Sequence, residues 1–197
     1  DFSDNRDEFN HIISNKKFTD NWHEDQVNQF LDNPVNFAMT AVLAGHADGL
    51  VAGAINPTSE IIRSAIRIIG IEKNSKWVSS IFFMIDRNRN HAMTFSDCGV
   101  IPEPSSEQLA FIAKEASNFH KLLTGEKAKV AFLSFSTKGS AKHYKVDRVR
   151  KAVELFKKNN KDIESEGEIQ FDAAYDQSIR EKKIPKIARR IPCNKRP

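Results

Sequence analysis

Apolar residues recur every three or four positions in two stretches of the first half of the chain, and this spacing predicts amphipathic helices. The first stretch, residues 22–45, contains Pro34. Because proline cannot donate a main-chain hydrogen bond inside a helix, we expect two helices there. The second stretch begins at Thr58 or Ser59, either of which can cap a helix, and it ends at Gly70. Three helices are therefore expected between residues 22 and 70.

Three other stretches have the pattern of strands. Ala47–Ala54 is short and rich in small apolar residues, which predicts a strand packed closely against its neighbours. Trp77–Ile85 and His91–Ser96 are apolar runs separated by the polar residues 86–90. This arrangement is typical of a β-hairpin.

A long helix is expected after the hairpin. Ser105 is followed three residues later by Gln108, which fits a capping box, and Gly125 is placed where such a helix would end. Next, the apolar run Val130–Leu133 predicts a strand buried on both faces, as in a parallel sheet. The chain therefore passes from a helix into a core strand.

The last part of the chain continues this alternation. A further helix is expected from about Val146, and Glu168–Ala174 is predicted to be a short strand followed by a brief helix. Strands that alternate with helices at this spacing predict an α/β fold with mostly parallel sheets.

The segment that follows Val130–Leu133 is the main candidate for a binding site. Its residues are hydroxyl-bearing, cationic or glycine: Ser136, Thr137, Lys138, Gly139 and Ser140. Unpaired N–H groups at the start of a helix favour negative charge, so this STKGS loop (residues 136–140) is a candidate oxyanion or phosphate site. An ordinary strand-to-helix turn with a serine cap and a surface lysine would have the same residues. The spacing differs from the P-loop pattern, so nucleoside triphosphate chemistry does not follow.

Three charged residues outside the loop are further candidates. Arg63, one turn into its expected helix, can bind a phosphate through two hydrogen bonds, although a solvated arginine on a helix surface is the commoner case. Asp97, after an expected strand, could act as a base, position a substrate or, most commonly, form a turn, and Asp172 has the same alternatives, with its place inside an expected strand favouring a hydrogen-bonding role. The six histidines have no metal-ligand spacing, so we expect no metal site.

The positive charge is concentrated at one end of the chain. The formal net charge is +4, but residues 180–197 carry eight basic side chains and one acidic, which leaves −3 for residues 1–179. A nucleic-acid-binding domain is expected to carry its basic face on the folded part. We therefore expect no nucleic-acid partner.

Two prolines, Pro102 and Pro104, mark the predicted boundary between a first lobe, residues 1–101, and a second, residues 102–181. Residues 182–197 contain further prolines and no sustained period, so this basic tail is expected to be disordered. No apolar run reaches the length of a membrane span, and the N-terminus is acidic, unlike a secretion signal. We expect a cytoplasmic protein without a membrane partner.

Six segments of the chain carry a family resemblance: ADGLVAGA (47–54), TSEIIRSA (58–65), VSSIFFM (78–84), FSDCGVIPEPSSEQLAFIA (95–113), LSFSTKGSAKH (133–143) and GEIQFDAA (167–174). In this order they resemble the phosphate acetyltransferase family. Related transferases that act on butyryl groups share the fold, but the STKGSA and DC-x-V-x-P-x-P stretches are more similar to the acetyl enzymes.

The resemblance implies reversible transfer of an acetyl group between coenzyme A and inorganic phosphate, with acetyl-CoA, phosphate and acetyl phosphate as substrates and no resident cofactor or metal. The thiolate of coenzyme A would attack the carbonyl of acetyl phosphate, while positive charge and N–H groups stabilise the oxyanion and the phosphate. It also implies a homodimer of two-lobed chains, each with the three-layer α/β/α architecture of isocitrate and isopropylmalate dehydrogenases and a site in the cleft.

The resemblance assigns roles residue by residue. Ser136, Thr137, Lys138, Gly139 and Ser140 match the anion-binding loop of the family, and Arg63 matches an arginine expected to bind phosphate or the coenzyme. The family's serine–arginine pair, its aspartate base and a core strand have no counterpart here, which implies a chain truncated at both ends with catalytic residues unknown. An acyltransferase and a catalytically silent remnant that binds phosphate or a partner subunit are both open.

Overall fold

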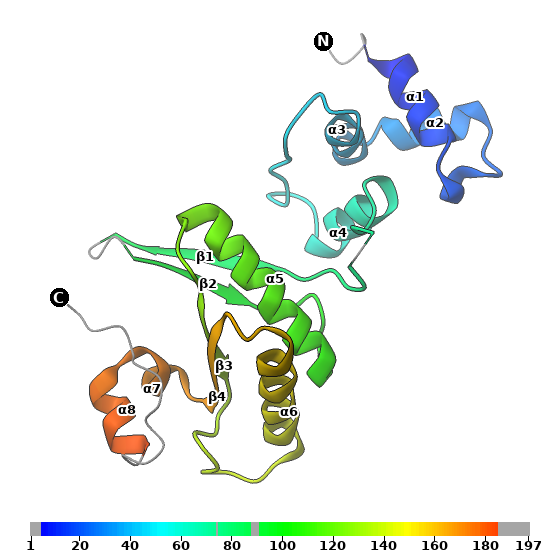
Figure 1. The fold of residues 1–197 in the computed structure, drawn as a ribbon. Helices are drawn as coiled ribbons and strands as arrows, with labels where there is room; N and C mark the ends of the chain where they lie inside the picture. The colour runs from blue at the N-terminus through cyan, green and yellow to red at the C-terminus, as the bar shows by residue number, and fades with distance from the viewer. Residues whose placement is uncertain (1–4, 74, 88–90, 185–197) are drawn as a thin grey trace. The chain divides into compact units, whose positions relative to one another are not determined.

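The computed structural model describes residues 5–73, 75–87 and 91–184 (Figure 1). The chain divides into two compact units, Asp1–Lys76 and Trp77–Pro197. Within the described residues, no helix is both long and apolar enough to cross a membrane.

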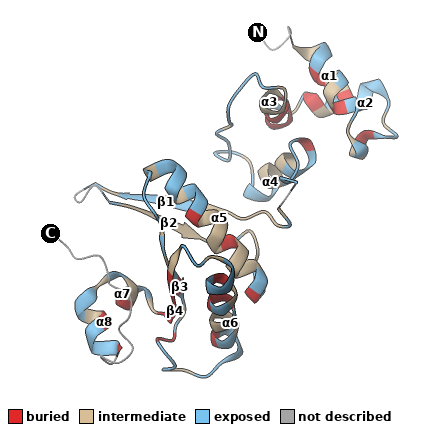
Figure 2. Ribbon diagram, in the orientation of Figure 1, coloured by how far each residue is buried: buried red, intermediate tan, exposed pale blue. Residues whose placement is uncertain are grey.

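The first unit is helical. Its elements are α1 (Arg6–Ser14), a short 3-10 turn (Lys17–Thr19), α2 (Glu24–Leu31), α3 (Pro34–Leu43) and α4 (Thr58–Ile68). Their buried apolar side chains form one core, visible on the helices in Figure 2, with Phe9, Ile13, Val27, Leu31 and Ile68 among its members. The predicted division at Pro34 is confirmed, because Asn33 caps α3 by accepting a hydrogen bond from the N–H of Val35.

The predicted strand Ala47–Ala54 is wrong. The segment is irregular, and all of its residues except Leu50 are exposed, with Val51 fully so. A strand needs a neighbouring strand to satisfy its main-chain groups. No strand of the described residues pairs with this segment, so small apolar residues alone do not make it one.

The second unit contains all the described strands. Its elements are β1 (Ile81–Asp86), β2 (His91–Ser96), α5 (Ser106–Thr124), β3 (Lys129–Leu133), α6 (Tyr144–Asn159), β4 (Glu164–Ile169), α7 (Phe171–Tyr175) and α8 (Gln177–Lys183). The predicted capping box is confirmed, since Ser105 and Gln108 exchange hydrogen bonds at the start of α5. The predicted end of α5 is confirmed too, because Gly125 takes the left-handed conformation there.

Two small sheets make the fold a mixed α/β one. β1 and β2 form the predicted antiparallel hairpin, in register from Ile81 opposite Ser96 to Asp86 opposite His91. β3 and β4 pair in parallel, and α6 connects them. One of the two described sheets is thus antiparallel, so the expectation of mostly parallel sheets applies only to the β3–β4 pair.

The strand β3 is buried on one face only. Phe132 packs with Val153 and Phe156 of α6, whereas Leu133 is 41% exposed. The prediction of a strand buried on both faces is therefore wrong for the described residues. The apolar run correctly indicated a strand that contributes to a core. Whether a second layer covers its other face depends on segments outside the run.

A glycine allows β3, β4 and α6 to pack closely. A Cβ atom added to Gly167 would lie 2.7 Å from the Cβ of Phe132 and 2.9 Å from a methyl carbon of Val153. Both contacts are much shorter than ordinary van der Waals separations. Position 167 therefore has no room for a side chain.

We expect Gly167→Ala to lower the free energy of unfolding by about 1–3 kcal/mol, because the added methyl group forces the strand and helix apart. Denaturation by urea, followed by circular dichroism, measures the change. Gly49→Ala is the matched control, since a Cβ there meets no atom within 4 Å. Equal stability of the two variants would contradict the close packing.

The predicted strand Glu168–Ala174 is only partly correct. β4 ends at Ile169, and residues 171–175 form the short helix α7, in whose first turn the Asp172 carboxylate accepts a hydrogen bond from its neighbour Ala173. Asp172 is therefore not part of a strand. A negative charge in the first turn interacts favourably with the helix dipole, which favours a helix start over a strand here.

Two predicted boundaries, at Pro102–Pro104 and at residue 182, can be compared with the structure. Pro102–Pro104 lies within the second unit, in the loop between β2 and α5, and the lobes 1–101 and 102–181 remain a prediction. Of the basic tail 182–197, Lys182 and Lys183 belong to α8 and Ile184 is buried. Residues 185–197 lie outside the described residues.

Candidate anion-binding site

The STKGS loop connects β3 to α6, as predicted. Its turn is sharp: Lys138 has φ +47° and Gly139 φ +90°, both in the left-handed region. Glycine takes this conformation freely, but a lysine does so only when surrounding contacts compensate. The loop is therefore held by its neighbours.

The main-chain N–H groups of this loop are already hydrogen-bonded. Those of Lys138 and Gly139 donate to Glu168, at 3.2 Å to its carbonyl oxygen and 2.6 Å to its carboxylate. The other three donate within the segment: Ser136 to Ser134 Oγ, Thr137 to Ser140 Oγ and Ser140 to Thr137 O. The N–H of Ala141, just after the loop, donates to Ser136 Oγ. The interpretation of the loop as a row of unpaired N–H groups is thus wrong.

Ser136 and Thr137 face the interior. Ser136 is fully buried, and its hydroxyl donates to the Glu168 carboxylate at 3.1 Å. The Thr137 hydroxyl donates to Gln170 Oε1 and accepts a hydrogen bond from Gln170 N–H. These two residues fasten the loop to the end of β4, which leaves Lys138, Gly139 and Ser140 on the exposed side.

Glu168 is the centre of the loop's hydrogen bonds. Its carboxylate also accepts two hydrogen bonds from Arg150 of α6, at 2.9 Å from Nε and 3.0 Å from Nη2. Burial by itself would raise the pKa of Glu168, but the hydrogen bonds from Arg150, the Gly139 N–H and Ser136 outweigh it and lower the pKa to about 2. Glu168 is therefore ionised at neutral pH.

The side chain of Lys138 is held by residues of β4. Its ammonium group lies 3.0 Å from Glu166 Oε1 and donates to the Gly167 carbonyl oxygen at 3.3 Å. Glu166 also forms a buried ion pair with Arg180 of α8. Lys138 thus has a fixed position while 29% of its side chain stays exposed.

The other three sequence candidates belong to other segments of the chain. Arg63 is exposed on α4 of the first unit, so its joint action with the loop stays a prediction. Asp97, just after β2, has a left-handed backbone, and burial raises its pKa while the charge of Arg148 opposes that effect. Asp172 pairs with Lys183 at 2.7 Å, and a hydrogen bond from Lys183 is the main cause of its lowered pKa.

Four residues of this network are missing from the sequence prediction: Arg150, Glu166, Glu168 and Arg180. The available signal was Glu166, two positions before Glu168, which is the first residue of the predicted strand 168–174. Because β4 begins earlier, at Glu164, the two glutamates lie on one face of a strand. Acidic residues are depleted in strands, so two on one face indicate buried partners. Their partners come from helices far along the chain and could not be paired with them by spacing.

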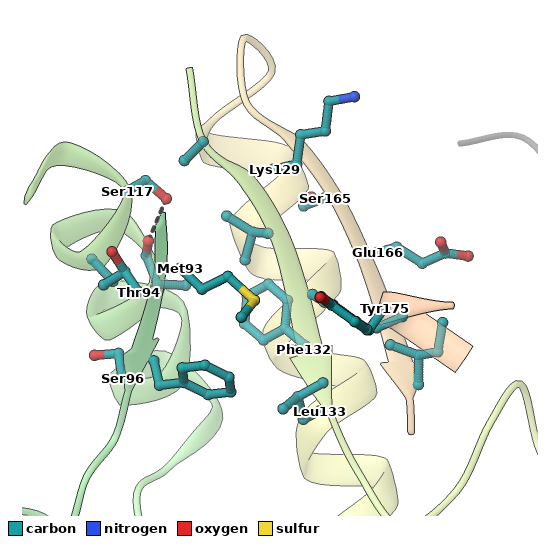
Figure 3. Close-up of a pocket in the computed structure, with 18 of the residues that line it drawn as sticks. Met93, Thr94, Ser96, Ser117, Lys129, Phe132, Leu133, Ser165, Glu166 and Tyr175 are labelled. Atoms are coloured by element: carbon teal, nitrogen blue, oxygen red, sulfur yellow. Dashed lines mark hydrogen bonds between the residues drawn. The ribbon is translucent and has the colours of Figure 1, made fainter. Parts of the chain in front are cut away.

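One groove lies within the second unit, between β2, α5, β3 and β4, with a volume of about 1540 Å³ (Figure 3). Its lining is largely apolar, and Met93 points into it from β2, with Phe132 and Leu133 on β3 opposite. The STKGS loop is not part of this lining. Among the described residues, no group of three or more His, Cys, Asp or Glu side chains could hold a metal ion.

The mixed α/β fold of this chain matches one family of transferases. The sequence model of that family, described as phosphate acetyl/butaryl transferase, matches residues 2–189. The chain belongs to this family.

Its relatives agree in name. The chain is 41% identical over 165 residues to the phosphate acetyltransferase of Thermoanaerobacterium thermosaccharolyticum and 42% identical over 166 residues to that of Staphylococcus aureus. In both alignments 82% of this chain covers 50% of the relative. The chain therefore spans about half the length of the curated relatives it matches.

Solved structures agree as well. A phosphotransacetylase from Staphylococcus aureus superposes with a TM-score of 0.76 at 38% identity, over 93% of this chain and 56% of that one. A phosphotransacetylase from Streptococcus pyogenes gives 0.74 at 32% identity, over 94% and 55%. The similarity thus extends over both units of the chain.

Proposed function

We propose that this chain supplies the phosphate-binding part of a phosphate acetyltransferase, which transfers an acetyl group reversibly between coenzyme A and inorganic phosphate. The observation that carries the proposal is the family match over residues 2–189. It is supported by relatives called phosphate acetyltransferase at about 40% identity. The substrates would be acetyl-CoA and phosphate, or coenzyme A and acetyl phosphate, with no resident cofactor.

Acetyl transfer requires the site to stabilise negative charge. When the thiolate of coenzyme A attacks acetyl phosphate, a C–S bond forms, the C–O bond to phosphate breaks, and phosphate leaves with the electron pair. Negative charge therefore grows on the carbonyl oxygen and on the departing phosphate, and a fixed positive charge stabilises both. Lys138 is the cation of the loop with exposed surface, and its position is set by Glu166.

The six site residues then divide into two groups. Lys138, Gly139 and Ser140 lie on the exposed side of the loop. The side chains of Lys138 and Ser140 would contact the phosphate, Gly139, whose N–H is bound to Glu168, would let it approach the main chain, and Arg63 would be a second cation for phosphate or coenzyme A. Ser136 and Thr137 are buried and would shape the loop. The residues that activate the thiol and protonate products are not assigned in this chain.

We expect Lys138→Ala to raise the KM for inorganic phosphate about tenfold, because it removes a charge-assisted contact with the anion. Formation of acetyl-CoA from acetyl phosphate and coenzyme A, and its reversal by phosphate, measures the activity. Arg63→Ala is expected to act in the same direction. Lys157→Ala, which removes an exposed lysine of α6, is the matched control.

An unchanged KM in both Lys138→Ala and Arg63→Ala would contradict the site assignment. The catalytically silent alternative makes a different prediction: phosphate binding that depends on Lys138, without any acetyl-CoA formed. Calorimetric titration of the chain with phosphate, together with the assay of acetyl-CoA formation, distinguishes these results.

We further propose, on the same family membership, a two-lobed, three-layer α/β/α architecture of the isocitrate dehydrogenase type for the whole protein, with lobes meeting near Pro102–Pro104. A homodimer in the cytoplasm, without nucleic-acid or membrane partners, completes this proposal. The parallel β3–α6–β4 unit is the part of the described fold that supports it.

A further inference from the structure

The interior of the STKGS loop holds a carboxylate where an anion-binding loop is expected to hold its ligand. Three groups donate hydrogen bonds to the Glu168 carboxylate: the N–H of Gly139 at 2.6 Å, the hydroxyl of Ser136 at 3.1 Å, and the guanidinium of Arg150 at 2.9 and 3.0 Å. The donors that could bind an anion from inside are thus occupied by a side chain of the same protein.

Glu168 does not belong to the loop it organises. It lies on β4 at the irregular position between two residues that pair with β3, Gly167 and Ile169, and only 3% of the residue is exposed. The paired residues on both sides fix its position, and the loop folds onto it. The dependence is mutual, since a buried carboxylate needs donors and the loop donors need an acceptor.

The left-handed turn depends on this contact. Lys138 at φ +47° has an unfavourable backbone, and the hydrogen bonds on both sides of it end on Glu168: Lys138 N–H on its carbonyl oxygen and Gly139 N–H on its carboxylate. Removing the carboxylate would free one of the two. The turn that sets the direction of the Lys138 side chain would then relax.

Arg150 makes a carboxylate compatible with a phosphate nearby. A lone negative charge beside the loop would repel a second anion, but the two hydrogen bonds from Arg150 oppose it with a full positive charge. The pair therefore holds the loop without giving it a net negative charge.

We infer that Glu168 is a positioning residue, which holds the STKGS loop so that Lys138 and Ser140 face the phosphate while Glu168 itself never touches it. This inference rests on the proposed function, because phosphate is the ligand that the positioned loop is assigned. Glu168 would act on binding through the shape of the loop, with Arg150 as its counter-ion.

Two measurements on the 197-residue chain test this inference. Hydrogen exchange of the Lys138 and Gly139 amides, followed by NMR, reports the order of the loop without any ligand. Calorimetric titration with inorganic phosphate reports binding. The variants are Glu168→Ala, the milder Glu168→Gln, which keeps an acceptor oxygen for Gly139, and Glu154→Ala, which removes an exposed glutamate of α6 as a control.

We expect Glu168→Ala to accelerate amide exchange in the loop and to raise the Kd for phosphate about tenfold to a hundredfold, with Glu168→Gln in between. Formate, which can occupy the place of the lost carboxylate, should slow the exchange again in Glu168→Ala alone. Glu154→Ala should match the unsubstituted chain in both measurements. If Glu168→Ala fails to fold, the same comparison is made with Glu168→Gln.

The outcomes separate the two proposals. Unchanged exchange in the loop, or an unchanged Kd despite faster exchange, overturns the role of Glu168 and leaves the proposed function standing. Absence of phosphate binding by the unsubstituted chain overturns the phosphate function, while accelerated exchange that formate reverses still supports Glu168 as the residue that orders the loop.

Discussion

Replacing Arg180 with methionine is expected to lower the free energy of unfolding of this chain by about 3 kcal/mol, because the change leaves Glu166 buried without its main partner. Arg180 and Glu166 are 6% and 7% exposed, so both are largely removed from water. Methionine keeps much of the apolar volume of arginine, and the loss therefore reports the charge. Lys138 stays 3.0 Å from Glu166 and keeps the effect at the lower end of the range for buried pairs.

Urea denaturation of the single and double variants measures this contribution. Arg67→Met, which removes an exposed arginine of α4, should leave the stability within about 0.5 kcal/mol. Combining Arg180→Met with Glu166→Gln should recover part of the loss, since the buried charge is removed as well. Strictly additive losses in the double variant would show that Arg180 stabilises the chain independently of Glu166.

Acidification from pH 5 to pH 2 is expected to cost about 3 kcal/mol of stability through Glu168 alone. The pKa of Glu168 is lowered from 4.5 to about 2 in the folded chain. A carboxyl group with a depressed folded-state pKa stabilises the fold fully above its unfolded pKa, and this contribution is lost as the pH falls toward the folded value. One pKa unit corresponds to about 1.4 kcal/mol, which gives the size of the effect.

Urea denaturation at several pH values measures how the free energy of unfolding changes with pH. Comparing this slope between the original chain and Glu168→Gln isolates the contribution of Glu168. The variant cannot titrate at this position, so its slope between pH 5 and pH 2 should be shallower. Glu154→Gln, at an exposed position, should keep the original slope. A slope in Glu168→Gln that equals the original one would mean that Glu168 titrates normally.

Helices were predictable where their signals are local. Pro34 with its cap Asn33, the pair Ser105 and Gln108, and Gly125 each act within one turn of the chain, so their effect on the backbone is legible in the sequence. The hairpin of β1 and β2 is local as well. The helix α1 was missed, because its residues are mainly polar and only Phe9 and Ile13 are buried.

The strand predictions failed where pairing depends on segments that are distant in the sequence. Ala47–Ala54 and the residues after Ile169 have plausible strand composition, but pairing needs another segment at the right distance, which composition does not report. The family resemblance did locate the STKGS loop and the segment that contains Glu168. It did not reveal that one binds the other.

The sequence by itself determined the division at Pro34, the limits of α5, the α/β alternation and the family, since these depend on residue spacing within short segments and on motifs. The predicted cap of α4 at Thr58 or Ser59 is wrong, because the helix begins at Thr58 and Pro57 before it provides no side-chain cap. Only the tertiary structure decided which groups accept the hydrogen bonds that the loop donates. Ser136 and Gly139 donate to a carboxylate some thirty positions away, at 3.1 and 2.6 Å, and Arg150 reaches the same group from α6. A buried charge is stabilised by whichever donors the fold brings to it, and the linear order of residues does not specify them.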